Sequence, residues 1–460
     1  MRNFTTNNRR GSSSIVVSIV LILIIALFAF IYMSPMFERN APKIGIANSL
    51  YWNLKKPLKL NLSDDSGIKF VRITLSDGKN SIEIFKKLYT DIKKSQLVDI
   101  KFPRTGFTST KKKFQLLIDA TDSSKWNFLS GNSAKKSVNI TIDRRRPELY
   151  VVNNSYKIIK GGVATVVFKA KDANLKSLYI DTNFGKKFYP TPFYKQNYFV
   201  SLLAWPVEQK KFRATIVAID KAGNVSKMPI RLFYVNKKYR ISNIKLKDNF
   251  LDGKIADLIS EVKPELSSAS KVDQFKYINE KLRKINEDII EKETTPIDKE
   301  MINSFYQKRF YPLRNGKPVA SFGDHRYYSY NGKRISEAWH LGLDLASVRA
   351  AKIKTQNSGT VVFADQNGIY GNNLIIYHGL GLYTLYGHCS SFLVNKGDSV
   401  KAGQVVAHTG STGLALGDHL HFGVLVQGVE VRPAEWMDKK WMKTNIFSII
   451  KASKKMIDRK

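Results

Sequence analysis

The segment from Ile15 to Met33 constrains this chain more than any other, because it carries no charge and is almost entirely apolar. As a helix rising about 1.5 Å per residue, it covers close to the ~30 Å hydrocarbon core of a bilayer. A cleavable signal peptide has an apolar stretch of about 7–15 residues, whereas this stretch is longer and continues into Phe28, Phe30 and Tyr32. The sequence therefore predicts an uncleaved transmembrane helix over residues 15–33.

Basic residues on one side of this segment predict its orientation. Arg2, Arg9 and Arg10 precede it, with no acidic residue among them. By the positive-inside rule, residues 1–14 form a cytoplasmic tail, and everything after Met33 lies outside. The expected protein crosses the cytoplasmic (inner) membrane once and exposes its domains on the periplasmic or extracellular side.

The charge balance indicates anionic partners. The chain has 75 Lys and Arg against 38 Asp and Glu, a formal charge of +37. Such a surface attracts polyanions. The basic residues are scattered and no nucleic-acid-binding signature occurs among them, so nucleic acid ranks last. Anionic lipid headgroups and cell-wall carboxylates fit the charge equally well.

The residues that follow the apolar segment are expected to form β-sheets. Short alternating apolar runs fill residues 41–236, and Phe114–Asp122 is echoed by Phe212–Asp220. The echo predicts two immunoglobulin-like β-sandwiches, over 41–146 and 147–236, joined at the charged Asp143–Pro147 stretch. The second copy resembles the bacterial immunoglobulin-like modules of exported proteins.

A change of periodicity marks the next segment. Helical spacing replaces alternation, so residues 237–305 are expected to form a helical linker with a cap at Ser270. This linker could pack on the next domain, bridge it to the sandwiches, or occlude a groove. The predicted core stripe comprises Val272, Phe275, Ile278, Leu282, Ile285 and Ile289.

The chemistry lies near the C-terminus. All seven histidines fall between His325 and His421. His340 and Asp344 are four residues apart in an extended segment, and His419 and His421 are two apart, so each pair projects from one face. Catalytic zinc usually takes three such ligands and leaves a fourth position for water.

These residues resemble the signature of the lysostaphin-type (LytM-like) zinc metallopeptidases, which act on peptidoglycan. The signature consists of a His-x-Gly-x-Asp segment, a later Tyr-x-His and a closing His-Leu-His-Phe. In this sequence they are His340–Asp344, Tyr386–His388 and His419–Phe422, in that order. The resemblance extends from about Pro318 to Trp436. It implies an antiparallel β domain, here 306–440, followed by a basic tail over 441–460.

The resemblance also assigns roles that spacing alone leaves open between His419 and His421. It implies that Zn²⁺ is bound by His340, Asp344 and His421, with His388 and His419 as catalytic groups beside the ion. The implied activity is that of a zinc endopeptidase that cleaves peptide cross-links or stems of peptidoglycan through a metal-activated water. The fold class expected for the whole chain is mainly β, with an N-terminal transmembrane helix, two sandwiches, a helical linker and the peptidase domain.

Other interpretations remain beside this one. The chain could be a non-catalytic or latent member of the family that regulates another cell-wall hydrolase, with a protein regulator as partner. It could also be a binding module in which the sandwiches carry the function, so that His421→Ala leaves the cellular role unchanged. We expect structural roles for His325, His378 and His408 and a packing role for Cys389. The sequence does not reveal which peptide bond is cut.

Overall fold

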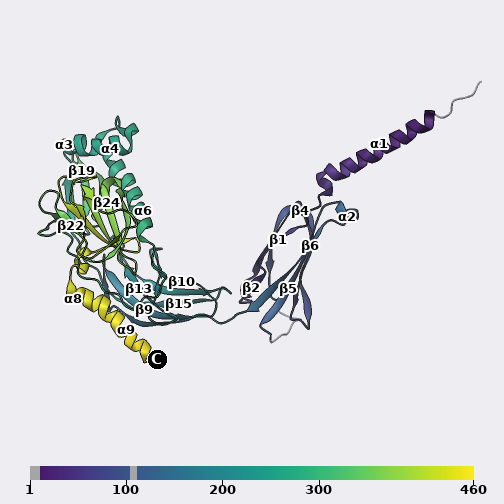
Figure 1. Ribbon diagram of the computed structural model, residues 1–460, viewed down its shortest axis with the longest axis horizontal. Helices are drawn as coiled ribbons and strands as arrows, with labels where there is room; N and C mark the ends of the chain where they lie inside the picture. Colours follow the sequence, from purple (N-terminus) through teal and green to yellow (C-terminus); the bar gives the residue numbers. More distant parts are fainter. Residues whose placement is uncertain (1–10, 104–110, 460) are drawn as a thin grey trace, which may run out of the picture. The chain divides into compact units, whose positions relative to one another are not determined.

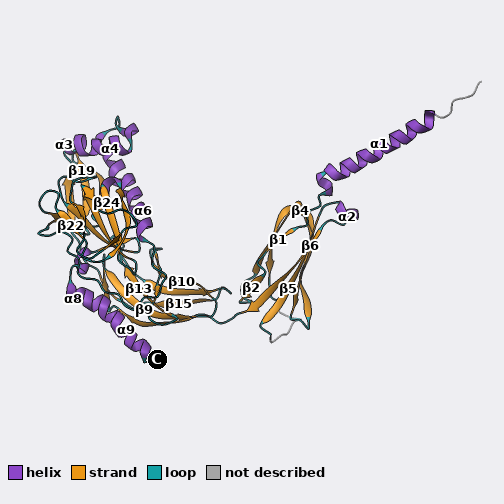
Figure 2. Cartoon of the chain, viewed as in Figure 1, coloured by secondary structure: helices purple, strands orange, loops and turns teal. Residues whose placement is uncertain are grey.

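The computed structural model describes residues 11–103 and 111–459. The predicted tail arginines Arg2, Arg9 and Arg10 lie outside the described residues. The described chain is dominated by strands, which confirms the predicted mainly β fold class (Figure 2). It divides into two compact units, Met1–Arg146 with Asp220–Asn224 and Pro147–Ile219 with Val225–Lys460.

The first unit begins with the apolar helix α1 (Gly11–Met33; Figure 1). Within the described residues, Ile15–Met33 is the one helical segment long and apolar enough to cross a membrane, and none of it is buried. No carboxylate lies in its first turn and no basic residue in its last. A short 3₁₀ turn, Pro35–Phe37, follows with Ser34 as its cap.

Six strands of the first unit form one sheet with the order β1-β3-β5-β6-β2, and β4 pairs with β3. Register shifts interrupt β3 between Ser63 and Ile68, where the long strand bends. The buried face carries the predicted alternation, with Leu60, Leu62 and Val71 fully enclosed. The elements are β1 (Lys43–Gly45), β2 (Ser49–Trp52), β3 (Leu58–Ser76), β4 (Ser81–Ile100), β5 (Lys113–Asp122), α2 (Trp126–Leu129) and β6 (Ser133–Ile142).

The second copy forms two separate four-stranded sheets, β11-β10-β14-β15 and β12-β13-β9-β7, and β16 pairs with β8. Its two sheets are those of a sandwich, whereas hydrogen bonds join the strands of the first copy into one sheet. The elements are β7 (Glu148–Asn154), β8 (Lys157–Ile159), β9 (Val163–Lys171), β10 (Leu175–Thr182), β11 (Lys187–Phe188), β12 (Thr191–Pro192), β13 (Tyr198–Ala204), β14 (Ala214–Asp220), β15 (Val225–Pro229) and β16 (Phe233–Val235).

The sequence echo between the copies has a structural counterpart. Each echoed strand ends in a buried aspartate, Asp122 or Asp220. An asparagine side chain donates to each carboxylate at 2.8 Å, from Asn132 and from Asn224 respectively. The backbone amide of the same asparagine also donates to the carboxylate. Both copies therefore follow this strand with the same Asp–Asn pair, in which the aspartate is buried.

The next segment begins with a strand, which differs from the expected helical linker. It consists of β17 (Ile241–Lys245), α3 (Asp248–Phe250), the π-helix η2 (Leu251–Ile255), α4 (Ala256–Val262), η3 (Pro264–Leu266), α5 (Lys271–Lys276), the π-helix η4 (Tyr277–Leu282) and α6 (Arg283–Thr294). Ser270 caps α5 as predicted, accepting from the Asp273 amide.

The predicted core stripe is wrong at its C-terminal end. Phe275, Ile278 and Leu282 are buried, but Ile285 is 50% and Ile289 36% exposed. Ile278 and Leu282 lie within the π-helix η4, and the two exposed isoleucines follow it. A π turn adds about one residue to the helical repeat. The buried positions after it are therefore shifted by one, to Asn286 and Ile290.

The C-terminal part contains the largest sheet, with the order β18-β21-β29-β25-β24-β23-β27 and β30 on β29. Two three-stranded sheets accompany it, β17-β19-β20 and β22-β28-β26. The strands are β18 (Lys317–Ala320), β19 (His325–Tyr330), β20 (Lys333–Trp339), β21 (Leu343–Ala346), β22 (Lys352–Lys354), β23 (Gly359–Gln366), β24 (Asn372–Tyr377), β25 (Leu382–Cys389), β26 (Ser391–Phe392), β27 (Ser399–Val400), β28 (Val405–His408), β29 (Leu420–Val426) and β30 (Val429–Val431).

The second sandwich and the C-terminal sheet share one hydrophobic core. Strand β13 packs on β29 and β30, and Gln427 exchanges two hydrogen bonds with the backbone of Tyr189. The predicted basic tail packs here too, because Ile450 and Ile457 of its last helix are buried against β7 and β9. The terminal elements are α7 (Pro433–Trp436), α8 (Lys439–Met442), the π-helix η6 (Lys443–Phe447) and α9 (Ser448–Asp458).

Glu435 is a buried acid at this shared core, and it predicts a pH dependence of stability. Its Oε2 accepts a hydrogen bond from the Val163 amide at 3.0 Å, and Glu435 is only 2% exposed to solvent. Burial raises the pKa of Glu435 to about 8, although the Val163 amide and Arg432 oppose the shift. The folded chain therefore holds a proton that the unfolded chain releases, and stability should fall as pH rises from about 5 to 8.

We expect Glu435→Gln to make this fall shallower, because the amide keeps an acceptor for Val163 and never ionises. Urea unfolding midpoints at pH 6, 7, 8 and 9 measure it. Burial raises the pKa of Glu430 in the same direction, but Glu430 is present in both proteins and cancels in the comparison. Parallel pH profiles for the two proteins would contradict the assignment to Glu435.

Candidate metal centre

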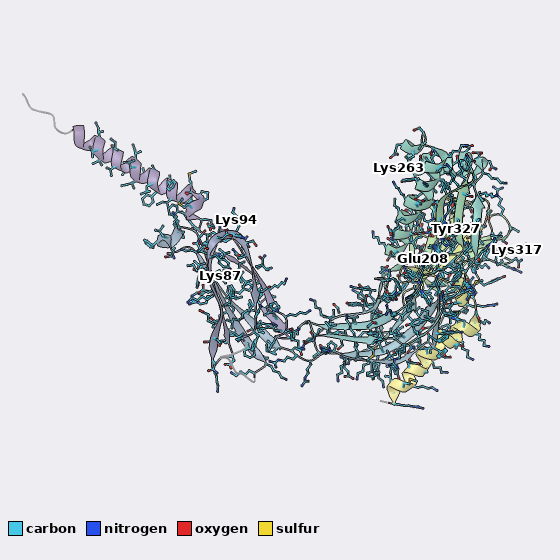
Figure 3. The ribbon with its side chains drawn as sticks, turned by 180° about the vertical axis from the view of Figure 1, so that it is seen from behind. Lys87, Lys94, Glu208, Lys263, Lys317 and Tyr327 are labelled. Carbon is cyan, nitrogen blue, oxygen red and sulfur yellow. The ribbon has the colours of Figure 1, made fainter. Side chains whose placement is uncertain are left out.

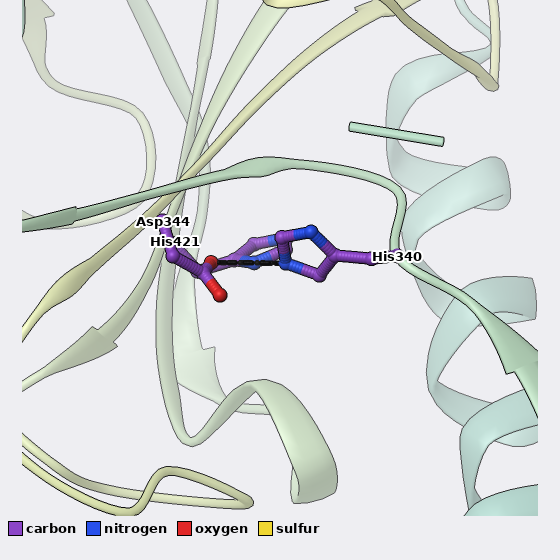
Figure 4. A group of neighbouring side chains, drawn as sticks. All are labelled: His340, Asp344 and His421. Atoms are coloured by element: carbon purple, nitrogen blue, oxygen red, sulfur yellow. Dashed lines mark hydrogen bonds and ion pairs between the residues drawn. The ribbon is translucent and has the colours of Figure 1, made fainter. Parts of the chain in front are cut away.

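Neighbouring strands bring the three predicted metal ligands together (Figure 4). Asp344 of β21 lies directly opposite His421 of β29 in the antiparallel register. Side chains of directly opposite residues project from the same face of a sheet. His340 precedes β21, and its ring reaches the same point. The structure thus places His340, Asp344 and His421 in one buried group.

The distances in this group match the geometry of one shared cation. His340 Nε2 lies 3.0 Å from Asp344 Oδ1 and 3.3 Å from His421 Nδ1, and His421 Nδ1 lies 2.8 Å from Asp344 Oδ1. Ligands about 2.0–2.1 Å from a tetrahedral zinc ion are separated by roughly 3.3 Å. The three ligand atoms could therefore bind a metal ion.

The tautomer of His340 supports the same conclusion. Its Nδ1 lies 2.9 Å from the carbonyl oxygen of Ser321, which can only accept, so Nδ1 carries the hydrogen. In the neutral ring, Nε2 then presents a lone pair to the Asp344 carboxylate. Two facing acceptors at this distance need a proton or a metal ion between them. A backbone carbonyl behind a histidine is also how metal-binding imidazoles are commonly oriented.

Gly342, between His340 and Asp344, leaves room for the ring of His421. A Cβ built on Gly342 would lie 2.5 Å from His421 Cε1 and Nε2 and 3.0 Å from the Phe422 carbonyl oxygen. Contacts that short do not occur between packed atoms, so a side chain here would displace the His421 ring. The glycine of the His-x-Gly-x-Asp pattern is thus required by packing.

We expect Gly342→Ala to weaken metal binding by roughly 10–100-fold, the range typical for losing the support of a ligand. Competition with a chromogenic zinc chelator measures it. Gly417→Ala is the matched control, because Gly417 lines the same groove and a Cβ there meets no atom within 4 Å. Equal zinc affinities for the two variants would show that the His421 ring does not depend on this space.

His388 and His419, the two predicted catalytic histidines, lie beside this group. Their ring centroids are 4.8 Å apart, and the His388 ring is 5.8 Å from that of His421. His388 Nδ1 donates to the Thr412 carbonyl oxygen, and His419 Nδ1 to that of Gly417, each at 2.8 Å. Because burial keeps the His388 ring neutral, the bond from its Nδ1 leaves Nε2 unprotonated and available for proton transfer.

Burial and neighbouring charge set the protonation of the group. Burial alone would raise the pKa of Asp344, but the close contacts with the His340 and His421 rings outweigh burial and lower that pKa far below its ordinary value. Burial lowers the pKa of His388 to about 3, assisted by His421 and His419. Burial also lowers the pKa of His421. A charged carboxylate beside neutral imidazoles is the state that binds a divalent cation.

A cavity of about 1340 Å³ surrounds the group and is open to solvent. One wall comes from the β17–α6 segment, including Ile244, Phe250 and Arg283, and another from the 414–419 loop. Lys254, which lines the first wall, donates from Nζ to the carbonyl oxygen of Ser411, just before the 414–419 loop, at 3.0 Å. Of the three roles that the sequence left open for this segment, packing on the domain is observed, and the segment also shapes the groove.

The strand β19 before the first ligand contains three tyrosines, Tyr327, Tyr328 and Tyr330, and packs against the β17–α6 segment. Tyr328 is buried and meets Phe275 edge-on at 5.1 Å, and the Tyr330 hydroxyl donates to Asp248 at 2.7 Å. Only Tyr328 of these tyrosines lines the cavity. Tyr327, which is labelled in Figure 3, belongs to the same strand β19.

The remaining histidines do not belong to the group. His378 is bonded to the Ser358 carbonyl oxygen and the Thr384 hydroxyl, His408 contacts Ser391, and His325 stacks on Trp339. Cys389 is fully enclosed, and burial raises the pKa of its thiol to about 12, which disfavours a nucleophilic thiolate.

Sequence reasoning missed the groups that orient the ligands. Ser321 and Thr412 contribute only carbonyl oxygens, and Tyr370 meets the His421 ring edge-on at 5.5 Å. All three lie within the range of the family resemblance, from about Pro318 to Trp436. The resemblance was the available signal for these groups, because every residue type has a backbone carbonyl and the residue type therefore does not reveal its role.

The fold and the donor set together define a metallopeptidase-type β domain. The sequence profile of peptidase family M23 matches residues 338–433. The C-terminal part of this chain therefore is a LytM-like domain of family M23, which confirms the resemblance seen in the sequence.

Individual relatives match the same part of the chain. The DD-carboxypeptidase/endopeptidase Mpg of Neisseria meningitidis is 34% identical over 108 residues, which make up 23% of this chain and 25% of that protein. The murein hydrolase activator NlpD of Salmonella dublin is 32% identical over 128 residues, 27% of this chain and 30% of that protein. The chain thus spans about a quarter of the length of these curated relatives.

Among solved structures, the catalytic domain of lysostaphin from Staphylococcus simulans is 30% identical. The similarity covers 27% of this chain and 94% of that domain, with a TM-score of 0.24.

Proposed function

We propose that this protein is a membrane-anchored zinc metalloendopeptidase that hydrolyses peptide cross-links or stems of bacterial peptidoglycan. The observation that carries the proposal is the group of His340, Asp344 and His421, with ligand atoms at tetrahedral spacing and two further histidines beside them. Membership of the groove-bearing domain in family M23 supports the substrate class.

A zinc ion held there would lower the pKa of a bound water towards ~7 and polarise the scissile carbonyl. His388 Nε2 is the proposed general base, because its Nδ1 is fixed by Thr412 and its low pKa keeps Nε2 unprotonated at neutral pH. His419 is the proposed partner that stabilises negative charge on the reacting oxygen. Asp344, held ionised by its neighbours, supplies the charge that retains the cation.

Digestion of purified peptidoglycan tests the proposal. The full-length chain in detergent is incubated with peptidoglycan, with and without a zinc chelator, and the released fragments are analysed by mass spectrometry. We expect chelator-sensitive release of fragments cut within peptide stems or cross-links. Intact peptidoglycan in the presence of a zinc-loaded chain would rule out an active endopeptidase under these conditions.

A latent or regulatory member of the family is the second candidate. The observation that favours it is the groove wall formed by the β17–α6 segment and tied to Ser411 by Lys254. One relative is itself named a murein hydrolase activator. If the wild type binds zinc without cleaving, Lys254→Ala should raise cleavage by loosening this wall. No gain would leave activation of another hydrolase as the function to test.

The anchor is also a proposal. Helix α1 has the length and composition of a membrane span, and its described side chains are unburied. We propose that it holds the protein in the cytoplasmic membrane, with the peptidase domain on the periplasmic or extracellular side. N-terminal sequencing of protein recovered from alkaline-washed membranes tests this, since a start beyond Met33 would identify a cleaved signal instead.

A further inference from the structure

A second cavity, of about 780 Å³, lies in the same unit, and it shares no lining residue with the groove over the histidines. Four segments form it: residues 306–311 before β18, residues 354–356 at the end of β22, residues 402–403 before β28, and residues 439–447 of α8 and η6. The proposed metal chemistry makes no use of it.

The charge of this cavity has one sign. Its lining carries five basic side chains and no acidic one. Each of the five is exposed, and within the described part of the chain none of them forms an ion pair. The five are Lys308, Arg309, Lys354, Lys439 and Lys443. Uncompensated charge concentrated in a concave surface attracts anions more strongly than the same charge spread over a convex one.

The groove over the histidines, by contrast, is lined by acidic as well as basic side chains, among them Asp324 and Asp418. The lysines labelled in Figure 3 come from β4, the helical segment and β18, namely Lys87 and Lys94, Lys263, and Lys317. Lys263 is paired with Glu265. The cavity therefore concentrates basic side chains locally, within a chain whose formal charge is +37 overall.

Aromatic rings accompany the basic side chains. The rings of Tyr306 and Phe447 lie 4.9 Å apart, and Tyr306 is 71% and Tyr311 47% exposed. Exposed tyrosines give a ligand an apolar face to stack on and a hydroxyl to bond at little conformational cost. Rings beside cationic groups suit a ligand that combines sugar faces with acidic groups.

The backbone beneath these side chains is held in place. Asn357 accepts from the Lys308 amide at 2.7 Å and donates to the Lys308 carbonyl oxygen at 2.9 Å. Gln356 accepts from the Tyr311 amide and donates to the Lys354 carbonyl oxygen. Asp438 caps α8, whose Lys439 lines the cavity. A lining fixed before binding lowers the entropy cost of binding.

We propose that this basic and aromatic cavity is a second binding site for peptidoglycan, which holds a carboxylate-bearing glycan and peptide strand away from the metal centre. The proposal rests on the proposed substrate. The cavity is concave, whereas attachment to a lipid surface uses a protruding apolar face, and the apolar face of α9 is already buried against β7 and β9. The site would raise the effective concentration of the polymer at the groove.

Binding to insoluble peptidoglycan tests the site without requiring cleavage. Full-length protein with His421→Ala, to prevent hydrolysis, is sedimented with purified sacculi at several salt concentrations. The test variant adds Lys308→Gln, Arg309→Gln, Lys439→Gln and Lys443→Gln. The control adds Lys79→Gln, Lys86→Gln, Lys94→Gln and Lys101→Gln in the first unit, which remove the same charge. We expect the test variant to bind roughly tenfold more weakly than the control. Equal binding would overturn the proposal.

Two further arms separate the sources of the effect. Tyr306→Ala should also weaken binding, and sacculi with amidated carboxylates should not distinguish the test variant from the control. If the test variant lost binding only to inorganic polyphosphate and kept its affinity for sacculi, the cavity would be a phosphate-polymer site and the proposal would fall.

The same four substitutions are also tested in protein with an intact His421. There, cleavage of a short soluble cross-linked peptide should be unchanged while cleavage of sacculi falls. Absence of any cleavage would refute the proposed function but leave the binding result interpretable.

Discussion

Asp344→Asn is expected to reduce bound zinc from one ion per chain to an undetectable level and to lower cleavage of peptidoglycan by at least about a thousandfold. The amide keeps the size of the carboxylate but removes the charge that holds a divalent cation between His340 and His421. Without the ion, a water in the groove returns from a pKa near ~7 towards that of bulk water, which removes the nucleophile. Elemental analysis of the purified protein and fragment release measure the two effects together.

The control for this substitution is Asp365→Asn, an exposed carboxylate on β23. It should retain zinc and activity. Full zinc occupancy in Asp344→Asn would show that this carboxylate is no ligand, and the tetrahedral interpretation of the group would fail. Loss of zinc with unchanged cleavage would instead show that cleavage does not require the metal.

His388→Ala is expected to retain one zinc ion per chain and to lower kcat by about 10²–10⁴-fold, the range typical of losing a general base. The reason is positional. His388 lies beside the His421 and His419 rings, but its nitrogen is not among the three clustered ligand atoms. Zinc content and the kinetics of a soluble cross-linked peptide measure the split between binding and turnover.

The double variant sharpens this prediction. If His388 and His419 act on the same step, combining His388→Ala with His419→Ala should cost much less than the product of the two single losses. Loss of zinc in His388→Ala alone would make His388 a ligand and contradict its assigned role.

The sequence predicted that His340, Asp344 and His421 lie together, and the structure brings their ligand atoms within reach of one ion, while their roles stay a prediction. Alternation in the strands was enough to place His340 beside Asp344 and to find β29. The choice of His421 over His419 needed the family resemblance. The structure places the His421 nitrogen 2.8 Å from Asp344, whereas the His419 nitrogen lies 3.9 Å away.

Packing between distant segments was the part that periodicity could not supply. One π-helix was enough to expose Ile285 and Ile289, because hydrophobic spacing assumes an unbroken helical repeat. The strand β17 forms only because β19 pairs with it in parallel. Neither the partner strand nor the π turn has a local sequence signal.

The shared core also changes how the protein should be tested. The second sandwich and the peptidase domain bury Val163, Leu202, Phe422 and Trp436 in one cluster. Removing all residues before about Phe305 would expose the peptidase side of that cluster to solvent, at a cost of about 25 cal/mol per Å². A truncated peptidase domain that failed would therefore say little about catalysis, so the tests above use the full chain.

Titration of metal-free protein with zinc tests the central claim most directly. The full-length chain is stripped with a chelator, returned to buffer, and assayed for peptidoglycan cleavage as zinc is added in steps below one equivalent. The account predicts that cleavage rises in proportion to zinc, levels off at one ion per chain, and shows no response in Asp344→Asn. Cleavage that is already complete before zinc is added, or that rises equally in Asp344→Asn, would contradict it.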